Sequence, residues 1–265
     1  MREPVVLSWS GGKDSAMALH ALRGDPRYEV VALLTCIAEE YRRISHHGVR
    51  EELLELQARS IGLPLDRVYL PSDAGVPCSN QRFEELMRAT LLRYCDAGVM
   101  CVAHGDLFLE DLRAYREANL ARLGMRGVFP LWKRDTAQLL RSFIDAGFNA
   151  YLCCVEGKLG ARFAGRAIDA ALLADLPPDV DPCGENGEYH SFVYDGPIFR
   201  EPLDVVVGEI VCRDTRFYAD LLPAHVRGAQ PASADAARAE RGRAAEVEGA
   251  NASRGARANS ARRAP

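Results

Sequence analysis

The sequence predicts an α/β fold, in which a Rossmann-like, doubly wound and mainly parallel sheet carries helices on both faces and a smaller α+β part follows it. Apolar runs alternate with segments of helical periodicity along the first part of the chain, the order that builds parallel sheets. The run from Tyr28 to Ile37 is apolar almost throughout, as in strands that are covered on both faces. The composition, with 48% hydrophobic and 26% charged residues among 265, is that of an ordinary globular protein.

The predicted elements follow one another in the order β-α-β-α-β-α-β as far as residue 103. The strands of this part are expected at Val5–Leu7, Tyr28–Ile37, Arg67–Leu70 and Val99–Ala103. Its helices are expected at Ala16–Leu22, at Glu51–Ile61 and from Asn80, the expected N-cap, to about Tyr94. Beyond it we expect helices in the later part of 105–117, over 135–146 and over 168–176, a strand at 149–155, and one or two strands within 203–212.

A glycine-rich turn, Ser-Gly-Gly-Lys-Asp-Ser over residues 10–15, joins the first predicted strand to the first predicted helix. The first N–H groups of a helix lack partners within it and the helix dipole adds positive charge, so this position suits a phosphate. Gly11 and Gly12 give the turn a flexible backbone, and Ser10 and Ser15 supply hydroxyl donors. Lys13 supplies an ammonium, and Asp14 is a candidate Mg²⁺ ligand. The spacing is not that of the common P-loop, and the plainer alternative is a tight turn without a ligand.

A second polar segment, His104-Gly105-Asp106, follows the strand predicted to end at Ala103. Ligands bind beyond the carboxyl ends of parallel strands, so we expect Gly105 and Asp106 to lie beside the glycine turn, with Asp106 as a second candidate Mg²⁺ ligand. His104 alternatively satisfies hydrogen bonds at the strand end. In the helix that follows, Tyr115 and Arg116 suit an oxyanion, and an outward ion pair is an equal alternative.

The densest polar cluster of the chain lies at residues 181–192. Glu185, Asn186 and Glu188 stand between two glycines, and a carboxylate there suits the binding of ammonium and the acceptance of its proton. The alternative is that both carboxylates only hold the loop in place. His190 is either a base or a ring that positions Glu188, and the pair His46–His47 either reaches a ligand or is a solvated loop.

Charge and cysteine content exclude several classes of protein. The net charge is −4 although the segment beyond residue 226 is rich in Arg, so the remaining chain is acidic and we expect no nucleic-acid partner. Eight cysteines form no C-x-x-C pair, which excludes a zinc ribbon, and Cys183 is expected to be structural. No apolar run has the length of a membrane helix and no signal sequence opens the chain, so we expect a cytoplasmic protein without a membrane partner.

Together these motifs resemble the diphthine–ammonia ligase family, which belongs to the PP-loop ATP pyrophosphatases within the adenine nucleotide alpha-hydrolase-like superfamily. The resemblance covers most of residues 3–205 and lies in Ser10–Ser15, Gly105-Asp106, Glu110–Arg113, Tyr115-Arg116, Pro130–Trp132 and Gly184–His190. The motif Ser10–Ser15 indicates the PP-loop ATP pyrophosphatases in general, and the motif Gly184–His190 indicates the diphthine–ammonia ligase family among them.

The resemblance implies an AMP-forming amide ligase, in which ATP adenylates a carboxylate, pyrophosphate leaves and ammonia displaces AMP. It implies ATP and Mg²⁺ as cofactors and ammonium as a partner. The acceptor is diphthine in the founding members, and here it stays open between a protein side chain and a small molecule. Together with the chemistry above, this gives the expected catalytic residues Lys13, Asp14, Glu185 and Glu188 and the expected Mg²⁺ ligands Asp14 and Asp106. The expected ATP-binding residues are 10–15 with Gly105 and Asp106. The expected substrate-binding residues are His47, Glu110, Tyr115, Arg116, Asn186 and His190.

We therefore divide the chain into an ATP-binding α/β domain (1–155), a smaller substrate-side part (156–223) and a tail (224–265) whose Ala/Arg-rich composition predicts disorder. Two other functions stay open. A PP-loop enzyme that modifies RNA would favour a basic surface and paired cysteines, and a nucleotide-binding sensor would need no acidic cluster. Whether the chain forms a homo-oligomer is also open.

Overall fold

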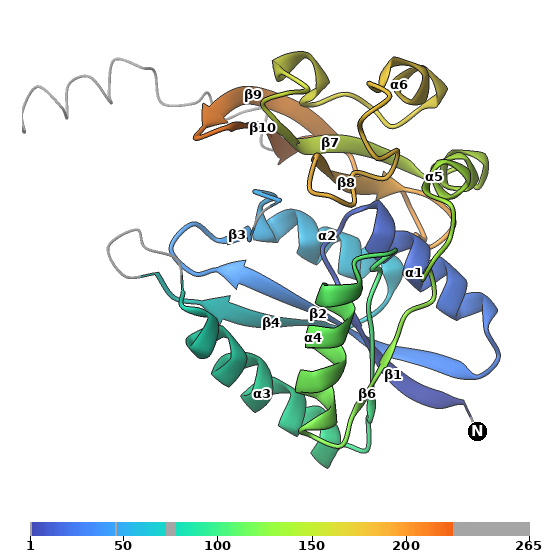
Figure 1. Cartoon of the computed structure of the whole chain (residues 1–265), viewed down its shortest axis with the longest axis vertical. Helices are drawn as coiled ribbons and strands as arrows, with labels where there is room; N and C mark the ends of the chain where they lie inside the picture. The colour runs from blue at the N-terminus through green and yellow to red at the C-terminus, as the bar shows by residue number, and fades with distance from the viewer. Residues whose placement is uncertain (1, 46, 73–77, 225–265) are drawn as a thin grey trace, which may run out of the picture. The chain divides into compact units, whose positions relative to one another are not determined.

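The computed structural model describes residues 2–45, 47–72 and 78–224 (Figure 1). They belong to the first of two units of the chain, Met1–Ala224. His46 and, apart from Ala224, the predicted tail lie outside the described residues. Within the described ranges, no helix has the length and apolar character that crossing a membrane requires.

The larger sheet is mainly parallel, with the order β3-β2-β1-β5-β6 and with β4 paired to β2. Its strands are β1 (Glu3–Ser8), β2 (Tyr28–Ala38), β3 (Arg43–Ile44), β4 (Leu65–Leu70), β5 (Cys101–Ala103) and β6 (Arg126–Val128). The short β3 runs antiparallel to β2, and the other pairings are parallel. The chain moves outward from β1 to β2 and β4 and then continues on the other side of β1 with β5 and β6, so the topological switch point lies between β1 and β5.

Helices cover both faces of this sheet, as the sequence predicts (Figure 1). The helices are α1 (Lys13–Gly24), α2 (Glu51–Ile61), α3 (Asn80–Asp96), α4 (Glu110–Ala121), α5 (Thr136–Asp145) and α6 (Ala170–Asp175). Side chains alternate along a strand, so Leu7 of β1 packs in a cluster with Leu53 of α2, whereas Val6 packs in a second cluster with Leu120 of α4. Each face of the sheet therefore has its own apolar layer.

A smaller antiparallel sheet follows, with the order β8-β7-β10-β9. Its strands are β7 (Asn149–Glu156), β8 (Tyr189–Asp195), β9 (Val205–Arg213) and β10 (Arg216–Pro223). The predicted fold class is confirmed, with a mostly parallel sheet flanked by helices and a smaller C-terminal sheet. The division at residue 155 stays a prediction, and the structure places β7 in the antiparallel sheet.

Two details of the sequence prediction differ from the structure. Helix α3 is capped by Ser79, whose hydroxyl accepts a hydrogen bond from the Arg82 N–H at 3.2 Å, so the prediction of Asn80 as the N-cap is wrong by one residue. A serine hydroxyl caps a helix as well as an asparagine amide does, and the two stand side by side. Strands β3, β6, β8 and β10 were not predicted. Strands β3 and β6 have only two and three residues, β8 begins within the polar cluster, and β10 lies beyond the predicted range 203–212.

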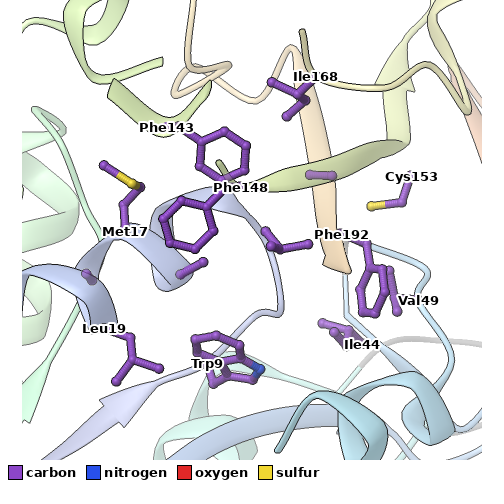
Figure 2. Packing of buried hydrophobic residues seen from close by; sticks show 14 of the residues in the cluster. Trp9, Met17, Leu19, Ile44, Val49, Phe143, Phe148, Cys153, Ile168 and Phe192 are labelled. Atoms are coloured by element: carbon purple, nitrogen blue, oxygen red, sulfur yellow. The ribbon is translucent and has the colours of Figure 1, made fainter. Parts of the chain in front are cut away.

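Both sheets contribute to one apolar cluster, which includes Trp9 after β1, Met17 of α1 and Phe192 of β8 (Figure 2). The rings of Phe143 and Phe148 stack within it, with centroids 4.9 Å apart and an interplanar angle of 11°. This shared core fixes the start of β8 against the glycine turn that follows β1, and the candidate site lies there.

Candidate functional site

The glycine turn lies at the carboxyl end of β1, where the sequence places it. Gly11 has a φ of +74°, which an L side chain rarely adopts, and Gly12 is the N-cap of α1 without any side-chain cap. The hydroxyl of Ser15 donates to the Gly12 carbonyl at 2.9 Å and lies 3.3 Å from the hydroxyl of Ser10. The uncapped first turn of α1 and the two hydroxyls form a group of donors that suits an anion.

Lys13 is 4% exposed, and its ammonium contacts the Asp14 carboxylate at 2.8 and 2.9 Å. The same ammonium lies 5.3 Å from the centre of the Tyr189 ring, at the start of β8. Burial is the largest influence and acts to lower the pKa of Lys13, but Asp14, Tyr189 and Cys183 together outweigh it and the pKa is raised. The ammonium therefore remains charged at neutral pH, and the backbone N–H of Lys13 donates to the Ser191 hydroxyl at 3.1 Å.

The segment after β5 packs directly on the glycine turn. A Cβ atom on Gly105 would lie 2.8 Å from the carbonyl carbon of Asp14, so only glycine fits this contact. Asp106 forms an ion pair with Arg116 of α4, with 2.7 Å between Oδ2 and Nε. Burial raises the pKa of Asp106, and the charge of Arg116 acts to lower it. Arg116 is therefore paired with a carboxylate of the candidate site itself.

His104 is 6% exposed, and its ring stacks on Phe129 with centroids 5.6 Å apart. Neither ring nitrogen has a hydrogen-bond partner in the part of the chain that the structure describes. Burial, together with Arg116, holds the pKa of His104 well below its ordinary value. The ring is therefore neutral at pH 7, and the structure gives no support to a role in satisfying the strand end.

The loop at residues 181–188, which we call the acidic loop, is held by its own hydrogen bonds. One oxygen of Glu188, Oε1, accepts from the Asp181 N–H and from the Asn186 amide, both at 3.1 Å. Asp181 in turn accepts from the Cys183 N–H at 2.9 Å and from the Glu185 N–H at 3.1 Å. Glu188 is 2% exposed, and although burial acts to raise its pKa, these hydrogen bonds hold the pKa below its ordinary value.

Glu185 lies in a different environment from Glu188. Its Oε1 accepts from the Leu107 N–H at 2.8 Å, so it reaches across to the segment after β5. Burial raises the pKa of Glu185 to about 7, and the charges of Asp14 and Asp106 add to this while Lys13 opposes it. Glu185 therefore shares one electrostatic environment with the glycine turn and is half protonated near neutral pH.

His47 and His190 form a stacked pair, with ring centroids 4.4 Å apart and an interplanar angle of 26°. A Cβ atom on Gly12 would lie 3.3 Å from Cε1 of His47, so this ring lies against the glycine turn. The predicted residues Glu110 and Tyr115 lie elsewhere, because Glu110 pairs with Lys133 and the Tyr115 hydroxyl donates to Glu84 at exposed positions of α4. The structure thus brings the two histidines to the turn but not these two side chains.

Sequence reasoning missed three residues of the site, Gln57, Tyr189 and Ser191. Each contacts the glycine turn or Lys13 from a segment far along the chain. Tyr189 and Ser191 lie in the polar cluster, but the sequence assigned no role to either, and Gln57 belongs to no motif. Cys183 was expected to be structural. Its buried thiol lies 3.2 Å from the Thr136 carbonyl, and burial raises its pKa to about 12, so it is no nucleophile at neutral pH.

The donor set at the turn is compatible with a cation that is shared with phosphate oxygens. Among the described residues, no group of three or more His, Cys, Asp or Glu could hold a metal ion alone. Mg²⁺ binds through one or two carboxylates together with substrate phosphates. Asp14 and Asp106 fit that pattern, since the charge of Asp14 raises the pKa of Asp106 and a cation would relieve this repulsion.

A mainly parallel α/β sheet, with a glycine turn at its switch point and an acidic loop linked to the segment beside that turn, defines a Rossmann-like protein with one candidate site. The chain matches the Diphthamide synthase N-terminal domain over residues 2–127 and the Diphthamide synthase C-terminal domain over residues 135–224. The chain belongs to the diphthine–ammonia ligase family.

Curated relatives support this membership across most of the chain. A diphthine–ammonia ligase of Schizosaccharomyces pombe is 28% identical over 221 residues, which are 76% of this chain and 36% of the relative. The diphthine–ammonia ligase of Danio rerio is 27% identical over 238 residues, with 79% of this chain and 89% of the relative covered. The diphthine–ammonia ligase of Homo sapiens is 26% identical over 236 residues, which are 79% of this chain and 85% of the relative. The chain therefore spans about a third of the yeast relative and most of each vertebrate one.

Proposed function

We propose that the protein is an AMP-forming, ATP-dependent amide ligase that adenylates a carboxylate and transfers ammonia to it. The observation that carries this proposal is that Glu185 accepts the Leu107 N–H at 2.8 Å, from the segment whose Gly105 packs against Asp14 of the glycine turn. A site for phosphates and a carboxylate of near-neutral pKa are thus close enough to serve the two halves of one reaction. The names of the relatives add the reaction class.

The phosphate half is assigned to the glycine turn and the segment after β5. The uncapped start of α1, with Ser10, Gly11, Gly12 and Ser15 around it, would bind the outer phosphates of ATP. The buried ammonium of Lys13 would stabilise the charge that develops on the leaving pyrophosphate. Asp14 and Asp106 would hold Mg²⁺, which supplies further neutralisation of that charge. Gly105 keeps its segment close to Asp14.

The amine half is assigned to the acidic loop, and its two glutamates receive different roles. Glu185 would accept a proton from bound ammonium, so that the ammonia formed attacks the adenylated carboxylate and AMP leaves; its pKa of about 7 suits a base that works near neutral pH. Glu188 and Asn186 would brace the loop, since they hydrogen-bond to one another and to the Asp181 N–H. Glu188 was predicted to be catalytic, and we propose that it is a positioning residue instead.

The acceptor carboxylate must approach the α-phosphorus between these two groups. His47 and His190 are proposed to contact the acceptor or the nucleotide, because their stacked rings lie against Gly12. Arg116 acts on the acceptor only through Asp106, with which it is paired. Glu110 and Tyr115 remain candidates for contact with a protein acceptor, since both are exposed on α4. A protein side chain and a small molecule are both compatible with this arrangement.

The reaction products test the proposal directly. Protein, Mg²⁺-ATP and ammonium are incubated with a diphthine-bearing translation elongation factor, and in parallel with small-molecule carboxylates. We expect AMP and pyrophosphate in equal amounts, dependent on both ammonium and the acceptor. Release of ADP and phosphate instead would show that the bond between the β and γ phosphates is cut, and the proposal would be wrong.

A further inference from the structure

One buried side chain joins the glycine turn to two other parts of the molecule. Gln57 of α2 is 0% exposed, and its Nε2 donates to the Gly11 carbonyl at 3.0 Å and to the Val193 carbonyl of β8 at 2.6 Å. Its Oε1 accepts from the indole N–H of Trp9 at 3.0 Å. The amide thus connects the residue that begins the turn, the turn itself and the strand that follows the acidic loop.

The partners of Gln57 determine which way its amide points and which residue type can stand there. Two carbonyl oxygens accept hydrogen bonds only, and an indole N–H donates only. A primary amide has two N–H hydrogens and one carbonyl oxygen, so it matches these three partners without a remaining donor. A carboxylate would place an acceptor against the two carbonyls, and an apolar side chain would leave buried polar groups without partners.

The turn packs closely against Gln57 and β8. Gly11 has a φ of +74°, and a Cβ atom there would lie 2.7 Å from Oε1 of Gln57. The Val193 N–H also donates to the Gly11 carbonyl, at 2.9 Å, so this one oxygen receives hydrogen bonds from α2 and from β8. Two residues earlier on β8, the Ser191 hydroxyl accepts from the Lys13 N–H. Strand β8 and α2 together therefore hold the turn in place.

We propose that Gln57 is a positioning residue of the nucleotide site, whose amide holds the glycine turn against β8 in the geometry that binds ATP. The inference rests on the proposed function, in that it takes the glycine turn as the site of the ATP phosphates. Gln57 touches neither the phosphates nor the acceptor in this scheme. It acts through Gly11 and Val193, and it links the turn to the strand that carries His190.

The first experiment measures ATP binding by calorimetry for the full chain and two variants, Gln57→Leu and Gln57→Glu. We expect each to weaken ATP binding about tenfold or more, because both remove the two donors to the carbonyls. Gln57→Glu keeps the acceptor for Trp9, so a role limited to packing around Trp9 predicts that this variant binds ATP as the wild type does. Leu91→Ala, in the cluster on the other face of the sheet, is the control that lowers stability without touching the turn.

A second measurement does not require that the variants fold well. The chain has two tryptophans, so its indole N–H region shows two NMR signals, and Trp132→Phe identifies the signal of Trp9. We expect ATP to shift the Trp9 signal in the wild type. Unchanged ATP affinity in both Gln57 variants, or a Trp9 signal that saturating ATP leaves in place, would overturn the inference alone. Failure of the wild type to bind ATP would overturn the proposed function as well.

Discussion

The glycine turn and the acidic loop are held in place mainly by different kinds of partner, although Thr136 and Arg216 also hydrogen-bond to the loop from outside. The turn is held from outside, by Gln57 of α2 and by Ser191 and Val193 of β8. The acidic loop is held from within, mainly by Asp181 and Glu188, which accept its own N–H groups. A turn held from outside leaves the N-cap of its own helix without a side-chain cap, although Ser191 takes the Lys13 N–H, whereas a loop held from within must use some of its polar side chains on itself.

This difference explains why two glutamates three positions apart have opposite pKa shifts. Glu188 is the more buried, yet its pKa is lowered because the loop supplies hydrogen bonds to its charged form. Glu185 receives one such bond, from Leu107, and its pKa is raised to about 7 by burial and neighbouring carboxylates. Burial and neighbouring carboxylates on one side, and the supply of hydrogen bonds on the other, therefore give the two glutamates opposite pKa shifts.

The largest expected effect comes from Lys13, where the turn meets the acidic loop. Lys13→Ala removes a buried ammonium next to Asp14, and we expect AMP formation to fall by about 10²–10³-fold, as for the loss of one preorganised contact to a developing charge. The rate is measured at saturating ATP. Lys133→Ala removes one of the chain's two other lysines at an exposed site and should leave the rate unchanged. An equal loss in both variants would contradict the assignment.

A sharper test of the comparison uses the two glutamates. Glu185→Gln should lower amide formation about 10²-fold, at the lower end for a general base, and should leave ATP binding intact. The wild-type rate should rise with pH up to about 7, because Glu185 must lose its proton to act, and this dependence should disappear in the variant. The pH profile of single-turnover amide formation measures it. A profile that Glu185→Gln leaves unchanged would assign the base elsewhere.

Glu188→Gln is the matched control for Glu185→Gln, and the two variants are compared by their free energy of unfolding at different pH values. The folded-state pKa of Glu185 is raised, so its contribution to stability is present below about pH 4.5 and is lost as the pH rises through about 7. The pKa of Glu188 is lowered, so its contribution is present above the ordinary pKa and is lost as the pH falls. Urea unfolding of each variant should therefore give pH-dependent differences from wild type of opposite slope, with the Glu188 variant less stable at pH 7.

The sequence was informative about elements whose signal is local. Apolar runs predicted β1, β2 and β5, and strand–turn–helix order placed the glycine turn and Asp106 at the same edge of the sheet. It also predicted that the polar cluster serves the same site, although nothing local separates Glu185 from Glu188. Burial, together with Asp14 and Asp106, which are distant in sequence, raises the pKa of Glu185, whereas hydrogen bonds within the loop lower the pKa of Glu188.

What the sequence could not provide was contact across the two sheets. The apolar spacing of α2 predicts the helix well, but not the role of Gln57 within it. In the sequence a single glutamine looks like an ordinary surface residue, and only the contact of α2 with β8 shows otherwise. Strand β8 itself begins inside a polar segment, so its pairing with the turn has no periodic signal. Local patterns therefore predicted the parts of the site, and long-range packing determined how the parts are held.

The smallest expected effect tests whether the turn is held from outside. Gly11 and Gly98 both have positive φ, of +74° and +80°, but a Cβ atom on Gly98 meets nothing within 4 Å, whereas on Gly11 it meets Gln57 and Leu54 at 2.7 Å. Gly98→Ala should therefore lower the free energy of unfolding by only about 1 kcal/mol, the backbone term. Gly11→Ala should lower it by about 3 kcal/mol, because crowding adds to that term. Urea unfolding measures both, and equal losses would mean that Gln57 and Leu54 yield freely, so that the turn is not clamped by α2.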